Sequence, residues 1–509
     1  MRGKPAVALA LLLLGPASAS APRAAADKEP GRDRNLAAAR QPASADERAA
    51  MLRGIDAKRE KYAGVAKEIW GFAEVGFQEL KSSALLQQQL KAAGFQVTAG
   101  VAGIPTAFVA TFGSGKPVIG IVGEFDALPG LSQEAQTANH HAIEEGAAGH
   151  GCGHNLLGTG ALASAVAVKE WLAASGHAGT LRYYGTPAEE GGSGKVYMIR
   201  EGLFKDVDVA VSWHPGDRNE ASPTSSTANI TGKFRFHGVA AHAAAAPDRG
   251  RSALDAVEAM DNMANMMREH IPSDARMHYV ITSGGSAPNV VPDFAESYYY
   301  VRHIDATVVE SIFDRLVKTA EGAALGTGTT MDYEVIGGTH NLLANETLAR
   351  VMNQKLNQVG GVTYTPEEQE FARKIYATLI SPTEELGSEK IVQAFDFERP
   401  GLGSTDVGDV SWTVPTVGLR TATWVPGTPA HSWQATAADG MSIGYKGMNV
   451  ASQTLALTGR ELFTHPKLIA DAKAEFEKRR GADFRYRALL GDRPPALDYR
   501  KGVPGGGSE

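Results

Sequence analysis

The stretch VIGIVG, residues 118–123, decides the fold, because all six of its residues are apolar or glycine. A strand with one face in water alternates apolar and polar side chains, whereas an unbroken apolar run is typical of a strand covered on both faces. Further strands are expected at 106–112, 180–185 and 207–213, and an Ala/Leu-rich helix is expected at 156–174. Strands that alternate with helices predict an α/β fold built on a mostly parallel sheet.

A second pattern begins after a Ser/Thr/Pro-rich linker at residues 222–227. The elements expected there are a strand at 229–237, a helix at 252–270, strands at 277–282 and 296–303, a helix at 307–324 and a strand at 330–336. This order is that of a split βαβ, ferredoxin-like unit inserted into the main domain. The predicted division of the chain is a signal peptide 1–19, a tether 20–48, the main domain 49–226 and 341–485, the inserted domain 227–340 and a flexible tail 486–509.

The first residues have the composition of an export signal. Arg2 and Lys4 supply positive charge, residues 6–14 form a short apolar run, and Ala17 to Ala19 provide a small-residue cleavage site. The sequence therefore predicts that the mature protein is exported, to the periplasm or as a secreted protein. The alternative interpretation is a buried N-terminal helix.

Composition and charge exclude several classes of function. The 509 residues are 43% apolar, and the net charge of −7 is spread along the chain without a basic block. A nucleic-acid-binding surface is therefore not expected. Beyond the N-terminus we find no apolar run of about 18 residues, so a membrane span is not expected either.

The stretch GHGCGHN, residues 149–155, contains the only cysteine of the chain. Cys152 and His154 are separated by one glycine, and both can face one point if the backbone follows an irregular path, which glycine permits. A thiolate binds metal ions strongly, and burial beneath an ion protects it from oxidation outside the cytoplasm. The alternative is a buried structural cysteine beside a surface histidine.

Other potential ligands follow the expected strands. Glu189 and Glu190 come directly after one strand, and His214 ends another, so both lie where ligands collect in an α/β sheet. Of two adjacent carboxylates, one can bind a metal while the other remains free as a base. His431 in PAHSW is a further imidazole. Separately these residues are also consistent with a solvated acidic turn and core histidines, whereas together they suit two divalent ions that share a ligand.

Seven motifs occur in order along the chain: GHGCGHN, TPAEEGG, SWHPG, GVAAHAAAAPDRGRSALDAV, PNVVPD, STDVGDVSW and TPAHSW. Together they resemble the M20 family of metallopeptidases and amidohydrolases, in particular its branch with a cysteine among the metal ligands. The resemblance covers roughly residues 50–480. It implies a hydrolase that cleaves the amide bond of N-acyl or N-aroyl amino acids, with aminobenzoyl-glutamate-like substrates. An exported dipeptidase or carboxypeptidase, and a non-catalytic metal- or solute-binding protein, are the alternatives.

The resemblance also implies a set of metal ligands. Two divalent ions per subunit, zinc or manganese, would share Cys152 as a bridging ligand. His154 and His214 would complete the site of one ion, and Glu190 and His431 that of the other. Glu189 would be the general base.

Further roles implied by the resemblance involve the inserted domain, which is expected to act as a lid and dimerisation domain. His242 would reach the active site of the partner subunit and stabilise the oxyanion there. Asn289 and Arg302 would hold the carboxylate of the substrate, although a surface salt bridge is the alternative for Arg302. We expect a homodimer, or a hetero-oligomer with a related subunit.

Three features depart from the family pattern or receive no catalytic role. Many members carry a metal-binding histidine on an early strand, but the equivalent stretch GEFDALPG, residues 123–130, has none. His140 and His141 are expected in a surface loop. Asp406 in STDVGD is expected to be structural or to support the site residues without binding metal itself.

Overall fold

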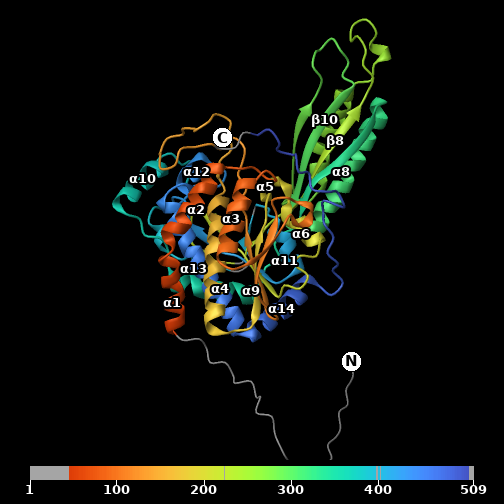
Figure 1. Cartoon of the computed structure of the whole chain (residues 1–509). Coiled ribbons are helices and arrows are strands. Elements are labelled where there is room, and N and C mark those ends of the chain that lie inside the picture. Colours follow the sequence, from red (N-terminus) through yellow and green to blue (C-terminus); the bar gives the residue numbers. More distant parts are fainter. Residues whose placement is uncertain (1–44, 223, 397–398, 402, 504–509) are drawn as a thin grey trace, which may run out of the picture. The chain divides into compact units, whose positions relative to one another are not determined.

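The computed structural model describes residues 45–222, 224–396, 399–401 and 403–503 (Figure 1). The expected signal peptide and nearly all of the expected tether lie outside the described residues, so both remain predictions.

The main domain is built on a six-stranded mixed sheet. Its strand order is β1 (Gln96–Ala99), β2 (Phe108–Ser114), β4 (Gly179–Gly185), β3 (Val118–Gly123), β5 (Val209–Val211) and β13 (Thr416–Val417). The last four of these strands are parallel to one another, whereas β1–β2 and β2–β4 are antiparallel pairs. The α/β class is confirmed, and the expectation of a mostly parallel sheet holds only for the four-strand block. Residues 115–117 join β2 to β3, too short a link for the crossover that a parallel orientation would require.

The burial of β3 on both faces explains why its sequence is apolar throughout. Every residue of β3 is buried. Ile119 and Ile121 belong to the core on one face of the sheet, and Val118 and Val122 belong to the core on the other. Because side chains alternate along a strand, both faces need apolar residues when helices cover both.

Helices cover both faces of this sheet (Figure 1). On one face α4 (His154–Ser175) contacts β3 and packs against α2 (Arg59–Phe72) and α13 (Ser442–Thr464). On the other, α6 (Gly194–Arg200) packs against α11 (Val407–Thr413). The remaining helices of this domain are α1 (Ala45–Asp56), α3 (Leu80–Ala92), α5 (Glu189–Gly192), α9 (Glu346–Val359), α10 (Pro366–Tyr376), α12 (Trp433–Asp439) and α14 (Pro466–Arg480).

Helix α4 corrects one expectation from the sequence. Among the described residues it is the one helix long and apolar enough to cross a membrane, although no such run was expected beyond the N-terminus. Of its most apolar stretch, 83% is buried inside the fold. Its apolar character is therefore accounted for by its central position in the core of the main domain.

Residues 228–339 form a second sheet with its own core. The strand order is β11 (Thr330–Thr339), β8 (Ala228–His237), β10 (Phe294–His303) and β9 (Arg276–Ser283), and all neighbouring pairs are antiparallel. Helices α7 (Ala253–Met267) and α8 (Ala306–Thr327) pack against each other and against this sheet. Figure 1 shows β8, β10 and α8 in green. The six expected elements are all present in the expected order.

The segment from residue 486 differs from the expected flexible tail, since residues 486–503 pack against the rest of the chain. The Arg493 guanidinium donates to the carbonyls of Val335 and Ile336 at 2.9 and 2.5 Å and pairs with Glu334 at 2.8 Å. The Tyr499 hydroxyl donates to the carbonyl of Glu190 at 3.0 Å. Arginine and tyrosine side chains with long-range partners hold this segment, although its backbone has no regular secondary structure.

We predict that Arg493→Ala lowers the free energy of unfolding by about 2 kcal/mol, because it removes charge-assisted hydrogen bonds to two carbonyls. Thermal unfolding followed by circular dichroism measures the effect. Arg485→Ala is the matched control, because the exposed Arg485 side chain donates only to carbonyls within three residues of it. Equal melting temperatures for the two variants would contradict the prediction.

Candidate active site

The predicted metal ligands and Glu189 come together near the carboxyl ends of the parallel strands. Glu189 and Glu190 follow β4, and His214 begins the short strand β6 (His214–Gly216) after β5. Cys152 and His154 lie at the start of α4, which follows β3 along the chain. This is the edge of an α/β sheet where ligands bind, because the loops after neighbouring parallel strands converge there.

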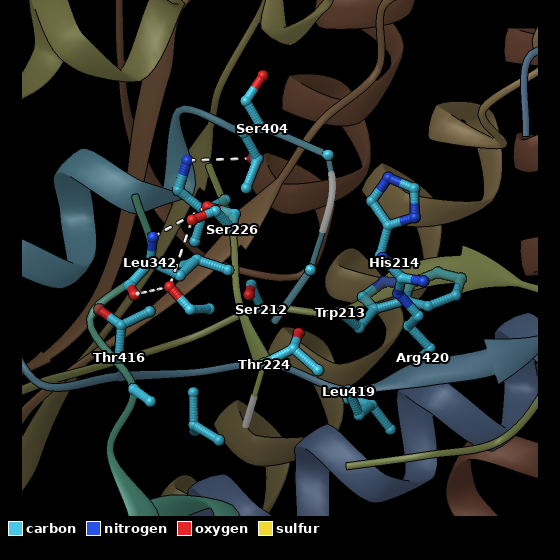
Figure 2. Close-up of a pocket in the computed structure, with 18 of the residues that line it drawn as sticks. Ser212, Trp213, His214, Thr224, Ser226, Leu342, Ser404, Thr416, Leu419 and Arg420 are labelled. Carbon is cyan, nitrogen blue, oxygen red and sulfur yellow. Dashed lines mark hydrogen bonds between the residues drawn. The ribbon is translucent and has the colours of Figure 1, made fainter. Parts of the chain in front are cut away.

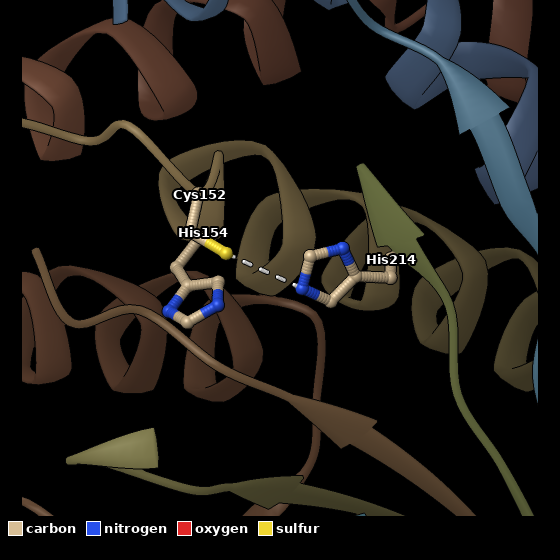
Figure 3. A group of neighbouring side chains, drawn as sticks. All are labelled: Cys152, His154 and His214. Atoms are coloured by element: carbon tan, nitrogen blue, oxygen red, sulfur yellow. Dashed lines mark hydrogen bonds between the residues drawn. The ribbon is translucent and has the colours of Figure 1, made fainter. Parts of the chain in front are cut away.

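The glycines of GHGCGHN are required by the path of the backbone. Gly153 precedes α4 with φ of +72°, a left-handed backbone conformation that residues other than glycine rarely adopt. A Cβ on Gly149 would lie 2.0 Å from the carbonyl oxygen of Leu131. This path brings the Cys152 sulfur and the His154 ring to the same side, facing His214 (Figure 3).

Cys152 belongs to two groups of potential ligands. Its Sγ atom lies 3.5 Å from Nε2 of His214, and the ligand atoms of Cys152, His154 and His214 all lie within 4.8 Å of one another. The ligand atoms of Cys152, Glu190 and His431 meet the same limit. The structure thus brings together the five residues predicted as metal ligands, with Cys152 common to both groups.

These residues fit two divalent ions. Nε2 of His154 lies 3.2 Å from Oε2 of Glu124, and Oε1 of Glu190 lies 3.2 Å from Nε2 of His431. Both atoms are buried, and neither contact has hydrogen-bond geometry within the described parts of the chain. Burying a polar atom without a hydrogen bond costs free energy, and a bound cation would remove that cost. Thiolate, imidazole and carboxylate together are a donor set that zinc accepts readily and manganese tolerates.

Asp126 orients two of these ligands, and the sequence interpretation missed it. Nδ1 of His154 donates to Oδ1 of Asp126 at 3.0 Å, which leaves Nε2 free for a metal. The other carboxylate oxygen accepts from the backbone N–H of Glu190 at 2.9 Å. Burial opposes ionisation of Asp126, but His154 outweighs it and lowers the pKa to about 2. Asp126 could have been found from the sequence as an acidic residue three positions after the end of the buried strand β3.

Glu189 lies beside these ligands in an acidic environment. Burial, followed by the charges of Glu190 and Glu124, raises the pKa of Glu189 well above its usual value. Nearby, the buried Lys195 ammonium forms ion pairs with Glu124 at 2.7 Å and with Asp406 at 2.6 Å. Asp406, expected to be structural, therefore fixes a buried cation. Lys195 and Glu124 were not predicted from the sequence.

The site residues predicted in the inserted domain, His242 and Asn289, do not lie beside the potential metal ligands of their own chain. His242 is exposed, and its Nδ1 accepts from the N–H groups of Ala244 and Ala245 at 3.2 and 3.1 Å. Asn289 is its neighbour, because its carbonyl accepts from the N–H of Ala243 at 3.0 Å. Both lie in loops at the end of the sheet where β10 begins.

Arg302 lies near the opposite end of β10, where its guanidinium donates to the Ser404 hydroxyl at 3.0 Å. The nine residues from Phe294 to Arg302 span roughly 27 Å of extended strand. Asn289 lies beyond Phe294, so within one chain Asn289 and Arg302 do not meet. His140 and His141, expected in a surface loop, are both exposed.

A cavity of about 420 Å³ adjoins the ligand cluster (Figure 2). Its lining includes Cys152, Glu189 and Glu190 on one side and a run of hydroxyl side chains elsewhere: Ser212, Ser222, Thr224, Ser225, Ser226, Ser404, Thr405 and Thr416. Arg420, which the sequence interpretation did not single out, also lines it. The cavity can therefore accept a small polar or anionic molecule beside the ligand cluster.

The comparisons with known proteins identify the class. A model described as peptidase family M20/M25/M40 matches residues 120–456, and the chain belongs to this family. It is 44% identical to one of the subunits of the p-aminobenzoyl-glutamate hydrolase of Escherichia coli, over 83% of this chain and 93% of that protein. It is 28% identical to the Xaa-Arg dipeptidase of Mus musculus, over 83% of this chain and 90% of that protein.

Solved structures share the fold, among them that of a dinuclear metal-binding peptidase of the M20 family from Bacillus subtilis, which is 15% identical to this chain. The TM-score is 0.54, with 80% of this chain and 99% of that chain covered.

We predict that Asp126→Asn weakens metal binding about 10- to 100-fold, because an amide has one acceptor oxygen and cannot fix both the ring of His154 and the backbone of Glu190. Competition with a chelator measures the affinity. Asp255→Asn, which alters an exposed carboxylate on α7, is the control. Unchanged metal affinity in Asp126→Asn would mean that Asp126 does not orient a ligand.

Proposed function

We propose that this protein is a metal-dependent hydrolase of N-acyl or N-aroyl amino acids, with aminobenzoyl-glutamate-like substrates. The observation that carries this proposal is Cys152, shared by two ligand groups, with the Glu189 carboxylate beside them, within 4.8 Å of a ring nitrogen of His154. The 44% identity to a p-aminobenzoyl-glutamate hydrolase subunit supports the substrate class. We also propose that the protein is exported, on the basis of its N-terminal sequence.

In this proposal, Cys152, His154 and His214 hold one divalent ion, and Cys152, Glu190 and His431 hold a second. Zinc or manganese at these positions would polarise the amide carbonyl and lower the pKa of a water molecule. Asp126 keeps the ring nitrogen of His154 directed at the ion.

Glu189 is the general base and acid. Its carboxylate takes a proton from the attacking water and then passes that proton to the amine nitrogen of the leaving amino acid. A raised pKa suits this role, because a carboxylate that must take a proton from water cannot be a very weak base. Its place between ligand residues and cavity puts it within reach of both water and substrate.

We further propose that the inserted domain acts as a lid and that a second subunit completes the site. In a single chain His242 and Asn289 lie far from Arg302, so they can act on one substrate only if they come from another copy or a related subunit. Strand β9 is an edge strand, and its Val280 and Ile281 are 58% and 46% exposed. An exposed apolar edge strand is a ready interface for another chain. A homodimer, or a hetero-oligomer with a related subunit, fits these features.

A dipeptidase is the second candidate, because the chain is also similar to a Xaa-Arg dipeptidase. Rates with N-aroyl, N-acyl and dipeptide forms of the same amino acids separate the two activities. We expect the N-aroyl forms to be cleaved fastest, and dipeptides cleaved fastest would establish the alternative.

We predict that Glu189→Gln lowers kcat about 100- to 10,000-fold while metal content stays unchanged, because the amide cannot accept the proton of the attacking water. Turnover and elemental analysis are measured on the same preparation. Glu201→Gln, at an exposed position after α6, is the control. Retained turnover would refute the assigned role, and a non-catalytic binder would show no turnover even in the unaltered protein.

Co-expression of two inactive variants tests the exchange of residues between subunits. We predict that His242→Ala and Glu189→Gln together recover about a quarter of normal activity, because half of the dimers are mixed and each mixed dimer contains one intact site. Activity per mole of protein is compared with that of each variant alone. A mixture no more active than the sum of its components would place His242 in the site of its own chain.

A further inference from the structure

Arg420 occupies a position that the proposed mechanism does not use. It is the first residue of β14 (Arg420–Ala422), which pairs in parallel with β6. In that pair Arg420 is directly in register with His214. Side chains in register on neighbouring strands project from the same face of the sheet, so Arg420 lies beside a predicted metal ligand. Figure 2 shows both residues at the cavity.

The backbone of Arg420 is held from two sides. In addition to its pairing with β6, its N–H donates to the carbonyl of Glu220 at 2.7 Å, and its own carbonyl accepts from the N–H of Glu220 at 3.0 Å. The position of the Cα atom is therefore fixed. The side chain extends from a rigid element into the cavity, which favours selective recognition because little needs to be ordered on binding.

The Arg420 guanidinium has no partner among the described residues: it makes no hydrogen bond or ion pair there, and the side chain is exposed to the cavity. Nearby arginines are paired, since Arg218 contacts Asp217 and Glu384 at 3.2 and 2.9 Å. Arg302 reaches the Ser404 hydroxyl. Arg420 thus presents unused N–H donors and a full positive charge to whatever enters the cavity.

We propose that Arg420 binds the side-chain carboxylate of an acidic amino acid in the substrate, and so selects N-acyl or N-aroyl derivatives of glutamate or aspartate. This inference rests on the proposed function. Arg302 and Ser404, on a separate part of the chain, remain available for the carboxylate next to the scissile amide. Two cationic positions match a leaving group with two carboxylates, and a guanidinium fork pairs with a carboxylate through two parallel hydrogen bonds.

The proposed role of Arg420 is tested by two substrates that have the same shape and differ in charge. Glutamine has the size of glutamate but lacks its negative charge, so it leaves the Arg420 guanidinium without a counter-ion. A site built to bind a charged group rejects the neutral analogue, because the ion pair is lost. We therefore expect the metal-loaded protein to prefer N-(4-aminobenzoyl)-glutamate over N-(4-aminobenzoyl)-glutamine about 100-fold in kcat/KM.

The test compares kcat/KM for these two substrates in the unaltered protein and in Arg420→Gln, Arg420→Lys and Arg218→Gln. Arg420→Gln should lose nearly all of the preference, through a higher KM for the glutamate substrate, while kcat/KM for the glutamine substrate changes less than about threefold. Arg420→Lys should keep part of the preference, because the charge remains but the fork is lost. Arg218→Gln is the matched control and should keep it all.

Two results would overturn the inference while leaving the proposed function intact. An unchanged preference in Arg420→Gln would show that the guanidinium does not contact the side-chain carboxylate. An equal loss on both substrates in Arg420→Gln and Arg420→Lys would show that Arg420 holds a group common to both, or only supports the fold. Failure of the unaltered protein to cleave either substrate would overturn the proposed function, and this inference with it.

Discussion

The structure depends on one electrostatic constraint: a thiol, two imidazoles and a carboxylate crowd together out of water. The ligand atoms of Cys152, His154 and His214 lie within 4.8 Å of one another, and so do those of Cys152, Glu190 and His431. Nε2 of His154 and Oε1 of Glu190 are buried without a hydrogen bond among the described residues. Such a group is costly to bury unless positive charge lies within it. Divalent ions meet this requirement, and they also supply the chemistry that amide hydrolysis needs.

A small number of surrounding side chains hold these ligands in place. Asp126 uses one carboxylate oxygen for the ring of His154 and the other for the backbone of Glu190, so a single side chain orients a ligand in each group. Lys195 joins Glu124 and Asp406 nearby. The segment after residue 486 adds a hydrogen bond from Tyr499 to the carbonyl of Glu190. The ligand loop after β4 is therefore fixed from the sheet and from the C-terminal segment.

The sequence predicted those features that depend on the type of residue at a given position within one strand or loop. The unbroken apolar run of β3 predicted a sheet covered on both faces, and glycines around Cys152 predicted an irregular path. It did not predict partnerships between distant residues, such as Lys195 with Asp406 or Arg493 with Val335, because these depend on packing and leave no periodic signal. The separation of Asn289 from Arg302 was equally hidden, since thirteen residues along the chain do not reveal that a strand extends between them.

The most direct test of the account is the position of bound metal in crystals of the protein, located by anomalous diffraction at the absorption edges of zinc and manganese. The account predicts two peaks, both within bonding distance of the Cys152 sulfur, one next to His154 and His214 and the other next to Glu190 and His431. A single peak, or peaks away from the sulfur, would contradict it.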